Sequence, residues 1–147
     1  MTTDKNEQPL ADIRIIDLTQ GIAGPYCTKI LADFGADVIK VEKPVVGDYA
    51  RRLGPFPNDK SDIEKSGIFL YLNTNKRGIT LDLKTQEAVD NLKDLVRGAD
   101  ILVESFQPGV MDKLGLGYDV LKEINPNLIM TSVSNFGQTG PYKDYLA

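Results

Sequence analysis

Three short segments carry residue types that favour ligand binding, and each lies beside a predicted strand. Residues 21–25 read GIAGP, and such small residues let the backbone approach a ligand just before a helix begins. Residues 73–78 read NTNKRG, whose two adjacent cations either grip a phosphate or form a solvated surface pair. Residues 104–109 read ESFQPG, in which Phe106 either stacks on a planar ring or packs in the core. These three turns are therefore where we expect a ligand to bind.

Reactive side chains are sparse in this sequence. It has no histidine, and its single cysteine, Cys27, cannot form an internal disulfide, so no metal site of the usual kinds is expected. Cys27 lacks an identifiable base partner and is predicted to be a buried structural residue. Asp17 ends a predicted strand, where a carboxylate more often bonds the amides of the next turn than acts as a general base. Glu42 is placed like a ribose-binding acid, but the G-x-G-x-x-G fingerprint is absent, which disfavours a dinucleotide-binding domain.

The composition is that of an ordinary soluble globular domain. Of the 147 residues, 41% are apolar and 26% are charged, which excludes disordered and fibrous classes. The net charge of -4 argues against nucleic acid and anionic membranes as partners, so an anionic ligand needs a local basic pocket. The apolar runs are too short for a signal peptide or a membrane span. A reducing cytoplasm is the expected location.

Hydrophobic patterning alternates strands with helices along the chain. Short β-branched or apolar runs predict strands, and glycine, proline and capping residues mark the ends of helices. Residues 68–73 fit either a strand or a helical turn, and residues 43–66 form a long excursion of a kind that is usually functional. The predicted strands are residues 13–18, 37–42, 78–83, 101–104 and 128–133, and the predicted helices are residues 25–34, 86–97, 108–115 and 118–124.

This alternation predicts an α/β fold with a Rossmann-like, mostly parallel sheet that has helices on both faces. Thr85 is expected to cap the second helix, which Gly98 ends. The first helix is expected to bury one apolar face by packing it against the sheet. Ligands of such sheets bind beyond the carboxyl ends of the strands, where the glycine turn and the ESFQPG turn lie. The face expected to be buried on the first helix consists of Cys27, Ile30, Leu31 and Phe34.

A series of motifs, in order and with natural spacing from about residue 11 to residue 141, resembles one known family. The motifs resemble the amino-terminal part of the class III coenzyme A transferases, the CaiB/BaiF group, which includes formyl-CoA transferases, carnitine CoA-transferases and α-methylacyl-CoA racemases. They are AGP from Ala23, LADFGADVIKVEKP from Leu31, NKRGITLDLK from Asn75, ADILVESFQPGVMDKLGLGYDVL from Ala99, NPNLI from Asn125 and SNFGQTGP from Ser134.

The resemblance implies a polar tail at residues 1–10 and, over residues 11–147, the N-terminal portion of a CoA-binding, Rossmann-like large domain. It also implies an interlocked homodimer, with CoA or acyl-CoA as a substrate and no tightly bound cofactor. Lysines at three of the matched positions would supply positive charge for the CoA phosphates. The matched CoA-binding residues are Ile22, Ala23, Lys43, Leu81, Lys84, Ser105, Phe106, Gln107 and Lys113.

For the transferase branch, the resemblance implies that CoA moves from an acyl-CoA to a carboxylic acid through an aspartyl anhydride and an aspartyl-CoA thioester. The nucleophilic aspartate is expected beyond Ala147, so residues 1–147 alone are expected to be inactive. Ile22 replaces a glutamine of members that act on formyl and oxalyl groups, which favours an apolar or bulkier acyl group. Two alternatives stay open: an α-methylacyl-CoA racemase-type isomerase, and a non-catalytic CoA-binding or interaction module.

Overall fold

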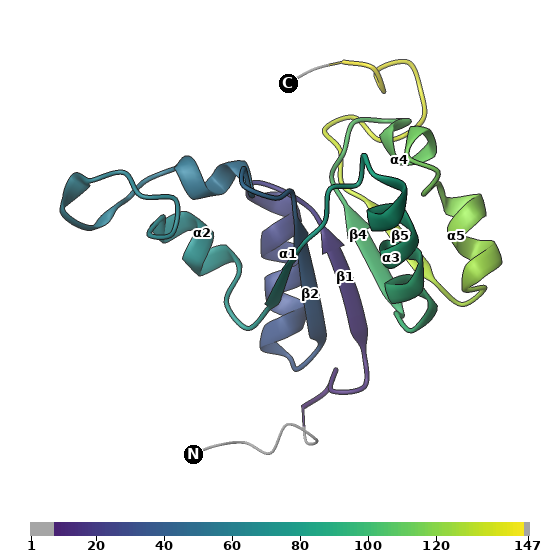
Figure 1. The fold of residues 1–147 in the computed structure, drawn as a ribbon, viewed down its shortest axis with the longest axis horizontal. Helices are drawn as coiled ribbons and strands as arrows, with labels where there is room; N and C mark the ends of the chain where they lie inside the picture. Colours follow the sequence, from purple (N-terminus) through teal and green to yellow (C-terminus); the bar gives the residue numbers. More distant parts are fainter. Residues whose placement is uncertain (1–7, 146–147) are drawn as a thin grey trace.

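The computed structural model describes residues 8–145, so most of the predicted tail at residues 1–10 lies outside the described part. Strands and helices alternate through the described residues, as Figure 1 shows. The elements are β1 (Arg14–Leu18), α1 (Ala23–Asp33), β2 (Asp37–Glu42), the 3₁₀ turns η2 (Tyr49–Arg52) and η3 (Pro57–Asp59), α2 (Gly67–Leu72), β3 (Arg77–Thr80), α3 (Gln86–Arg97), β4 (Ile101–Glu104), α4 (Val110–Lys113), α5 (Tyr118–Ile124) and β5 (Ile129–Ser132).

The sheet within residues 8–145 has five strands in the order β3-β2-β1-β4-β5. Every neighbouring pair is parallel, with Ile16 of β1 beside Ile39 of β2 on one side and beside Leu102 of β4 on the other. The chain therefore moves outward from β1 to β3 and then crosses back to β4. This order is that of a doubly wound sheet, whose switch point lies between β1 and β4. The predicted α/β class and parallel sheet are confirmed.

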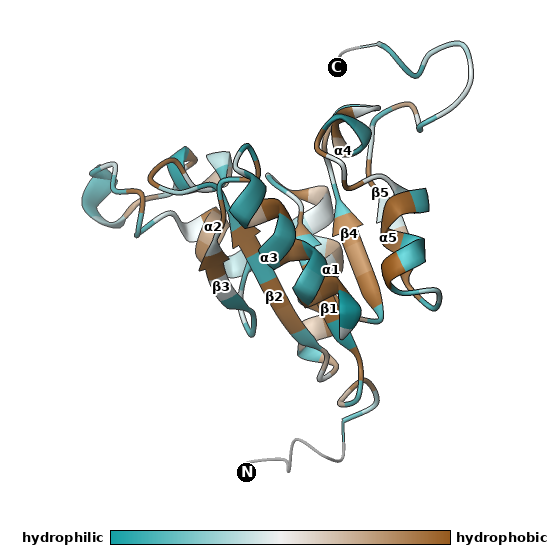
Figure 2. Cartoon of the chain, turned by 45° about the vertical axis from the view of Figure 1, so that its right-hand side comes forward, coloured by the Kyte–Doolittle hydropathy of each residue, from teal (hydrophilic) through white to brown (hydrophobic). Residues whose placement is uncertain are grey.

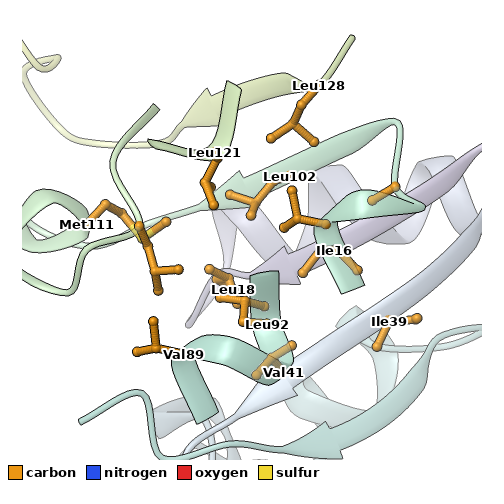
Figure 3. Packing of buried hydrophobic residues seen from close by; sticks show 13 residues of the cluster. Ile16, Leu18, Ile39, Val41, Val89, Leu92, Leu102, Met111, Leu121 and Leu128 are labelled. Atoms are coloured by element: carbon orange, nitrogen blue, oxygen red, sulfur yellow. The ribbon is translucent and has the colours of Figure 1, made fainter. Parts of the chain in front are cut away.

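Helices cover both faces of the sheet, and each face has its own hydrophobic cluster. Alternate residues of a strand point to opposite faces. Ile16, Leu18 and Leu102 therefore point toward α3 and α5, where they meet Leu92 and Leu121 in the larger cluster (Figure 3). The smaller cluster, on the α1 face, contains Ile15, Ala32, Ala36, Val38 and Val103.

Helix α3 forms where its sequence signals predict. The Thr85 side chain caps the helix by accepting a hydrogen bond from the Ala88 N–H at 3.3 Å, and Gly98 ends it. Its buried residues recur at helical spacing, and Leu92 and Val96 have no exposed surface. The outward surface of α3 is hydrophilic, whereas the strands behind it are apolar (Figure 2). Local chemistry and packing agree in this helix.

Helix α1 packs on the opposite side from the one predicted. It buries Gly24, Pro25, Thr28 and Ala32, and three of the four residues expected inside, Cys27, Ile30 and Phe34, are exposed. A Cβ atom on Gly24 would lie 2.4 Å from the Thr19 Cβ, so only a small residue allows this close approach. The predictions of a buried Cys27 and of that apolar face are therefore wrong, because a helix lying this close to the sheet needs small inward residues.

Residues 68–73, whose sequence fits either a strand or a helical turn, belong mainly to α2. The Ser66 hydroxyl caps this helix by accepting a hydrogen bond from the Phe69 N–H at 3.1 Å. The excursion between β2 and α2 contains η2 and η3, and it begins at the carboxyl end of β2 and runs outward beyond the sheet (Figure 1). Within residues 8–145, every helix falls short of the length and hydropathy that crossing a membrane would require.

Candidate functional site

Besides a hollow next to the ends of β4 and β5, two adjacent hollows lie at the carboxyl edge of the sheet, near the glycine turn and the ESFQPG turn. The first, which we call the β2–β3 hollow, has a volume of about 210 Å³. The second, the β1–β4 hollow, has a volume of about 780 Å³ and lies at the switch point of the sheet. Gln20 and Phe106 line both hollows, so the two are adjacent.

The structure brings eight of the nine residues matched to CoA binding to these two hollows. Among the described residues, Lys113 is the one that lines neither, since it lies exposed on α4. The eight come from loops that are far apart in the sequence and follow four different strands. Lys43, Leu81 and Lys84 line the β2–β3 hollow, Ile22, Ala23, Ser105 and Gln107 line the β1–β4 hollow, and Phe106 lines both.

The β2–β3 hollow combines an apolar floor with two free cations. Leu18, Val41 and Leu81 contribute apolar surface to its lining. Lys43 and Lys84 are exposed, and within the described part of the chain no carboxylate lies within 4.0 Å of either ammonium group. Such a slot suits a flat, partly apolar group that carries negative charge at its rim.

Glu42 also lines this hollow, but its charge is already matched. The Arg51 guanidinium donates from Nε to Oε2 and from Nη2 to Oε1, each at 2.8 Å, and the Asp48 N–H donates to Oε2 at 2.8 Å. Burial by itself raises the pKa of the Glu42 carboxyl, but Arg51 and the Asp48 amide outweigh it and hold that pKa below its usual value. Arg51 thus neutralises the acid that is placed like a ribose-binding one. Within the described residues, the charged lining residues without an ion-pair partner are Lys43, Lys84 and Asp82.

Phe106 packs against the core and is also accessible from the hollows, so its stacking on a planar ring stays a prediction. It is half-buried against the larger hydrophobic cluster and still contributes surface to both hollows. The buried Glu104 carboxylate accepts a hydrogen bond from the Phe106 N–H at 2.7 Å, and the Ser105 hydroxyl accepts one from the Gln20 N–H at 2.9 Å. The turns after β1 and β4 are therefore tied to each other.

A buried polar network lies beneath the glycine turn that follows β1. The Asp17 carboxylate accepts hydrogen bonds from the Thr19 N–H at 2.9 Å and the Thr28 hydroxyl at 2.7 Å, and Lys76 Nζ lies 3.0 Å from Oδ2. Burial alone raises the pKa of Asp17, but Lys40, Lys76 and the two hydroxyls outweigh it, so that pKa is lowered. The expectation that Asp17 bonds the next turn is confirmed.

The adjacent cations Lys76 and Arg77 differ in burial and in their ion-pair partners. The Lys76 side chain is 1% exposed, and burial lowers its pKa despite the favourable charge of Asp17. Arg77 is largely exposed and pairs with Asp37 at 2.7 Å. Neither is therefore free to grip a phosphate, and the interpretation as a solvated pair holds for Arg77 alone.

A second buried ion pair was not predicted from the sequence. Lys40 Nζ lies 3.0 Å from Asp48 Oδ2 and donates to the Thr19 carbonyl at 2.7 Å. Asp48 Oδ1 accepts from the Gly21 and Ala50 N–H groups, each at 2.9 Å. A usable signal exists, because Lys40 interrupts the apolar run VIKVE of β2, where a charge must find a buried partner. Groups of three or more potential metal ligands are absent from residues 8–145.

Comparisons with known proteins agree with the motif series. The sequence model of the family described as CoA-transferase family III matches residues 10–147. The chain is 48% identical to the succinyl-CoA–L-malate CoA-transferase beta subunit of Chloroflexus aurantiacus over 136 residues, which are 92% of this chain and 33% of that protein. It is 46% identical to the formyl-CoA:oxalate CoA-transferase of Bradyrhizobium diazoefficiens over 136 residues, 92% of this chain and 31% of that protein. The chain thus spans about one third of the length of these relatives.

Solved structures show the same fold. The CAIB/BAIF family protein from Brucella suis superposes with a TM-score of 0.84 at 41% identity, over 93% of this chain and 36% of that one. The crystal structure of Rv3272 from Mycobacterium tuberculosis gives a TM-score of 0.85 at 38% identity, over 95% of this chain and 37% of that one.

Proposed function

Because this chain belongs to CoA-transferase family III, we propose that the carboxyl edge of its sheet binds the CoA part of an acyl-CoA and that the whole protein transfers CoA to a carboxylic acid. The observation that carries this proposal is the convergence of eight matched residues, from loops after four strands, on two adjacent hollows. Ligands of doubly wound sheets bind at this edge.

The charges of the edge suggest how the CoA is oriented. Lys43 and Lys84 flank the β2–β3 hollow and are free to bind phosphate oxygens, so the nucleotide end of CoA lies there. The ring of Phe106 separates the two hollows and offers an apolar face to the same ligand. The thioester end then occupies the larger β1–β4 hollow.

The N-terminus of α1 opens into the hollow proposed for the thioester. Among the described residues, no side chain caps this 11-residue helix, and Ile22, Ala23 and Gly24 line the hollow. The first N–H groups of a helix lack partners within it and favour negative charge. They are therefore placed to stabilise the oxygen that gains charge when a thioester carbonyl is attacked.

The proposed reaction uses a carboxylate that is not among the buried acids of this edge. Asp17, Asp48 and Glu104 are each 2% exposed or less and already accept backbone hydrogen bonds. An aspartate beyond Ala147 attacks the thioester carbonyl, and the C–S bond breaks to give an acyl-aspartyl anhydride and a CoA thiolate. The thiolate attacks the aspartyl carbonyl, which frees the first acid. The acceptor carboxylate then attacks the aspartyl-CoA thioester, which expels the CoA thiolate and forms a second anhydride. The thiolate attacks the acceptor's carbonyl carbon in this anhydride, so that the new acyl-CoA forms and the aspartate leaves as a free carboxylate.

The proposed acyl donor carries a group larger than formyl. Ile22 lines the β1–β4 hollow with an apolar side chain that is 55% exposed, at the position where formyl-specific members of the family have glutamine. The Chloroflexus relative is named for succinyl-CoA, whose acyl group is such a larger one. Succinyl-CoA is accordingly the first donor to test.

Calorimetric titration of the full-length protein with CoA tests the binding proposal. Lys43→Ala and Lys84→Ala should each weaken binding about tenfold, because each removes one charge-assisted contact to phosphate. Lys122→Ala, on exposed α5, is the matched control and should leave the affinity unchanged. Absence of CoA binding to the wild-type protein, or equal affinity of all three variants, contradicts the proposal.

A transfer assay tests the reaction. Full-length protein incubated with succinyl-CoA and a second carboxylic acid should form the CoA thioester of that acid without net hydrolysis. Transfer of ¹⁸O from labelled acceptor to the released succinate is expected, because the acceptor oxygen passes through the aspartyl carboxylate over successive turnovers. Deuterium uptake at the α carbon of a 2-methylacyl-CoA, without transfer, would instead support the isomerase alternative.

A further inference from the structure

We propose that Asp48, together with Lys40, is a positioning residue that holds the glycine turn in the conformation in which Ile22 and Ala23 face the substrate. This inference rests on the proposed function, since it concerns the same edge of the sheet. Within the described part of the chain, neither residue lines the β2–β3 hollow or the β1–β4 hollow, so both act through the turn. Both side chains are buried, at 0% and 2% exposure, between the turn and the start of the excursion.

The ion pair fixes the turn at two backbone atoms. Lys40 Nζ donates to the Thr19 carbonyl at 2.7 Å, and Asp48 Oδ1 accepts from the Gly21 N–H at 2.9 Å. The residue between them, Gln20, donates its N–H to Ser105 Oγ at 2.9 Å. Two consecutive peptide groups, Thr19–Gln20 and Gln20–Gly21, are therefore held by three different segments, and the chain enters α1 at Ala23 two residues after Gly21. Rotation of either peptide group would break a buried hydrogen bond.

The same carboxylate also sets the distance between the turn and the excursion. Asp48 Oδ1 accepts from the Ala50 N–H as well as from the Gly21 N–H, so one oxygen bridges the two segments. Between these contacts lies Tyr49, whose hydroxyl oxygen is 1.9 Å from the place that a Cβ on Gly21 would take. Gly21 has φ of +80°, which also favours glycine. Asp48 thus closes the excursion directly over the turn.

The location of the pair argues for positioning rather than for stability alone. On the α1 face, the amino-terminal half of β1 and β2 buries Ile15 and Val38, which need no charge partner. On the same face, the charged residues Asp17 and Lys40 lie in the carboxyl half of these two strands, next to the carboxyl edge of the sheet. Buried ion pairs are weak contributors to stability, and apolar residues of similar volume often replace them without loss. Apolar replacements here would leave the Thr19 carbonyl and the Gly21 N–H without partners.

Substitutions in the full-length protein test this role. Asp48→Ala removes the acceptor of both N–H groups and should raise the Kd for CoA and the KM for acyl-CoA about tenfold. Asp48→Asn retains an oxygen at the same place and should restore both constants to within about threefold of the wild-type values. Lys40→Met keeps the apolar stem but releases the Thr19 carbonyl, and should weaken CoA binding about fivefold. It also keeps the test valid where Asp48→Ala does not fold.

A core variant separates positioning from lost stability. Val96→Ala removes buried volume from α3, on the opposite face of the sheet, without touching the turn. At a temperature where both variants are folded, Val96→Ala should bind CoA as the wild-type protein does. Equal weakening by Val96→Ala and Asp48→Ala overturns the proposal, as does wild-type affinity of Asp48→Ala.

Hydrogen exchange of the Gly21 amide tests the turn without any ligand. This amide should exchange at least tenfold faster in Asp48→Ala than in Asp48→Asn, because only the alanine variant lacks its acceptor. Failure of the wild-type protein to bind CoA would refute the proposed function alone, whereas unchanged exchange in Asp48→Ala overturns the positioning role.

Discussion

The two faces of the parallel sheet differ in what the same strands bury. Toward α3 and α5, β1 contributes Ile16 and Leu18 to an apolar cluster, and the buried charge on this face is Glu104, at the end of β4. Toward α1, the alternate residues of β1 are Ile15 and then Asp17, so this face changes from apolar to charged as the strand approaches the ligand-binding edge. Figure 3 shows the apolar face, where Leu92 of α3 lies close to Leu18 of β1.

The two faces therefore differ in what their contacts do: one mainly stabilises the fold, and the other fixes the positions of backbone atoms in the glycine turn. Apolar contacts are non-directional, so the α3 face stabilises the fold without fixing individual backbone atoms. Hydrogen bonds to buried charges are directional and fix the atoms that they join. The α1 face has such hydrogen bonds where the glycine turn lies at the carboxyl edge of the sheet. A sequence with apolar residues at these positions would fold with a less defined turn.

The largest effect is expected from breaking the charged face at Lys76. Lys76→Met should lower the free energy of unfolding by about 4 kcal/mol, because it leaves the Asp17 carboxylate buried with one fewer cation. Equilibrium urea denaturation of the full-length protein measures this loss. A loss below 1 kcal/mol would show that the charged face tolerates an unmatched acid.

The pH dependence of that loss sharpens the same comparison. The pKa of Asp17 is lowered in the folded protein, so its stabilising contribution is present above the unfolded value of about 3.9 and disappears as the pH falls through the folded value. Lys76→Met removes part of that contribution. The difference between wild type and variant should therefore be constant near neutral pH and narrow below about pH 4. A difference that widens in acid would contradict the assignment to Asp17.

On the apolar face, Leu92→Ala should cost about 3 kcal/mol. The side chain has no exposed surface, and its removal leaves a cavity among Ile16, Leu102 and other aliphatic groups. Urea denaturation at several pH values should give the same loss throughout, because the residues that form this cluster with Leu92 are apolar. A loss that tracks the titration of carboxylates would mean that the two faces are coupled.

At the glycine turn, Gly21→Ala should cost about 2 kcal/mol. The backbone φ of +80° strains any side chain, and the new Cβ would clash with the Tyr49 hydroxyl. Gly109 has a φ of +79° and open space around its missing Cβ, so Gly109→Ala is a control for backbone strain alone. It should cost about 1 kcal/mol by thermal or urea unfolding. Equal losses would mean that Tyr49 moves aside freely.

The smallest effect is expected from the exposed charge next to Lys76. Arg77 pairs with Asp37, the first residue of β2, so this pair lies at the amino-terminal end of the strands. The Arg77 side chain is 64% exposed. Arg77→Ala should lower the free energy of unfolding by less than about 1 kcal/mol, and added salt should remove most of that difference. A salt-independent loss as large as that of Lys76→Met would erase the distinction between the buried and exposed cations.

Much of the fold follows from local signals in the sequence. The apolar runs of the strands, the Thr85 cap and the Gly98 stop are each recognisable within a few residues, because they satisfy backbone groups nearby in the chain. The residues matched to CoA binding were predicted from the family resemblance. They lie together at one edge because the strands before them are parallel. Whether these residues contact CoA stays a prediction.

The inward side of α1 and the partners of Lys76 and Lys40 were decided by the tertiary structure. Patterning favoured the large apolar residues of α1 as its buried face, but the close approach of Gly24 to Thr19 turns Ile30 and Phe34 outward. Likewise, Lys76 lies 59 residues from Asp17, and no local rule pairs them. The sequence by itself determined which segments become strands and helices, since those signals act over a few residues. Contacts between distant segments chose the partners, because the burial of a charge depends on everything packed around it.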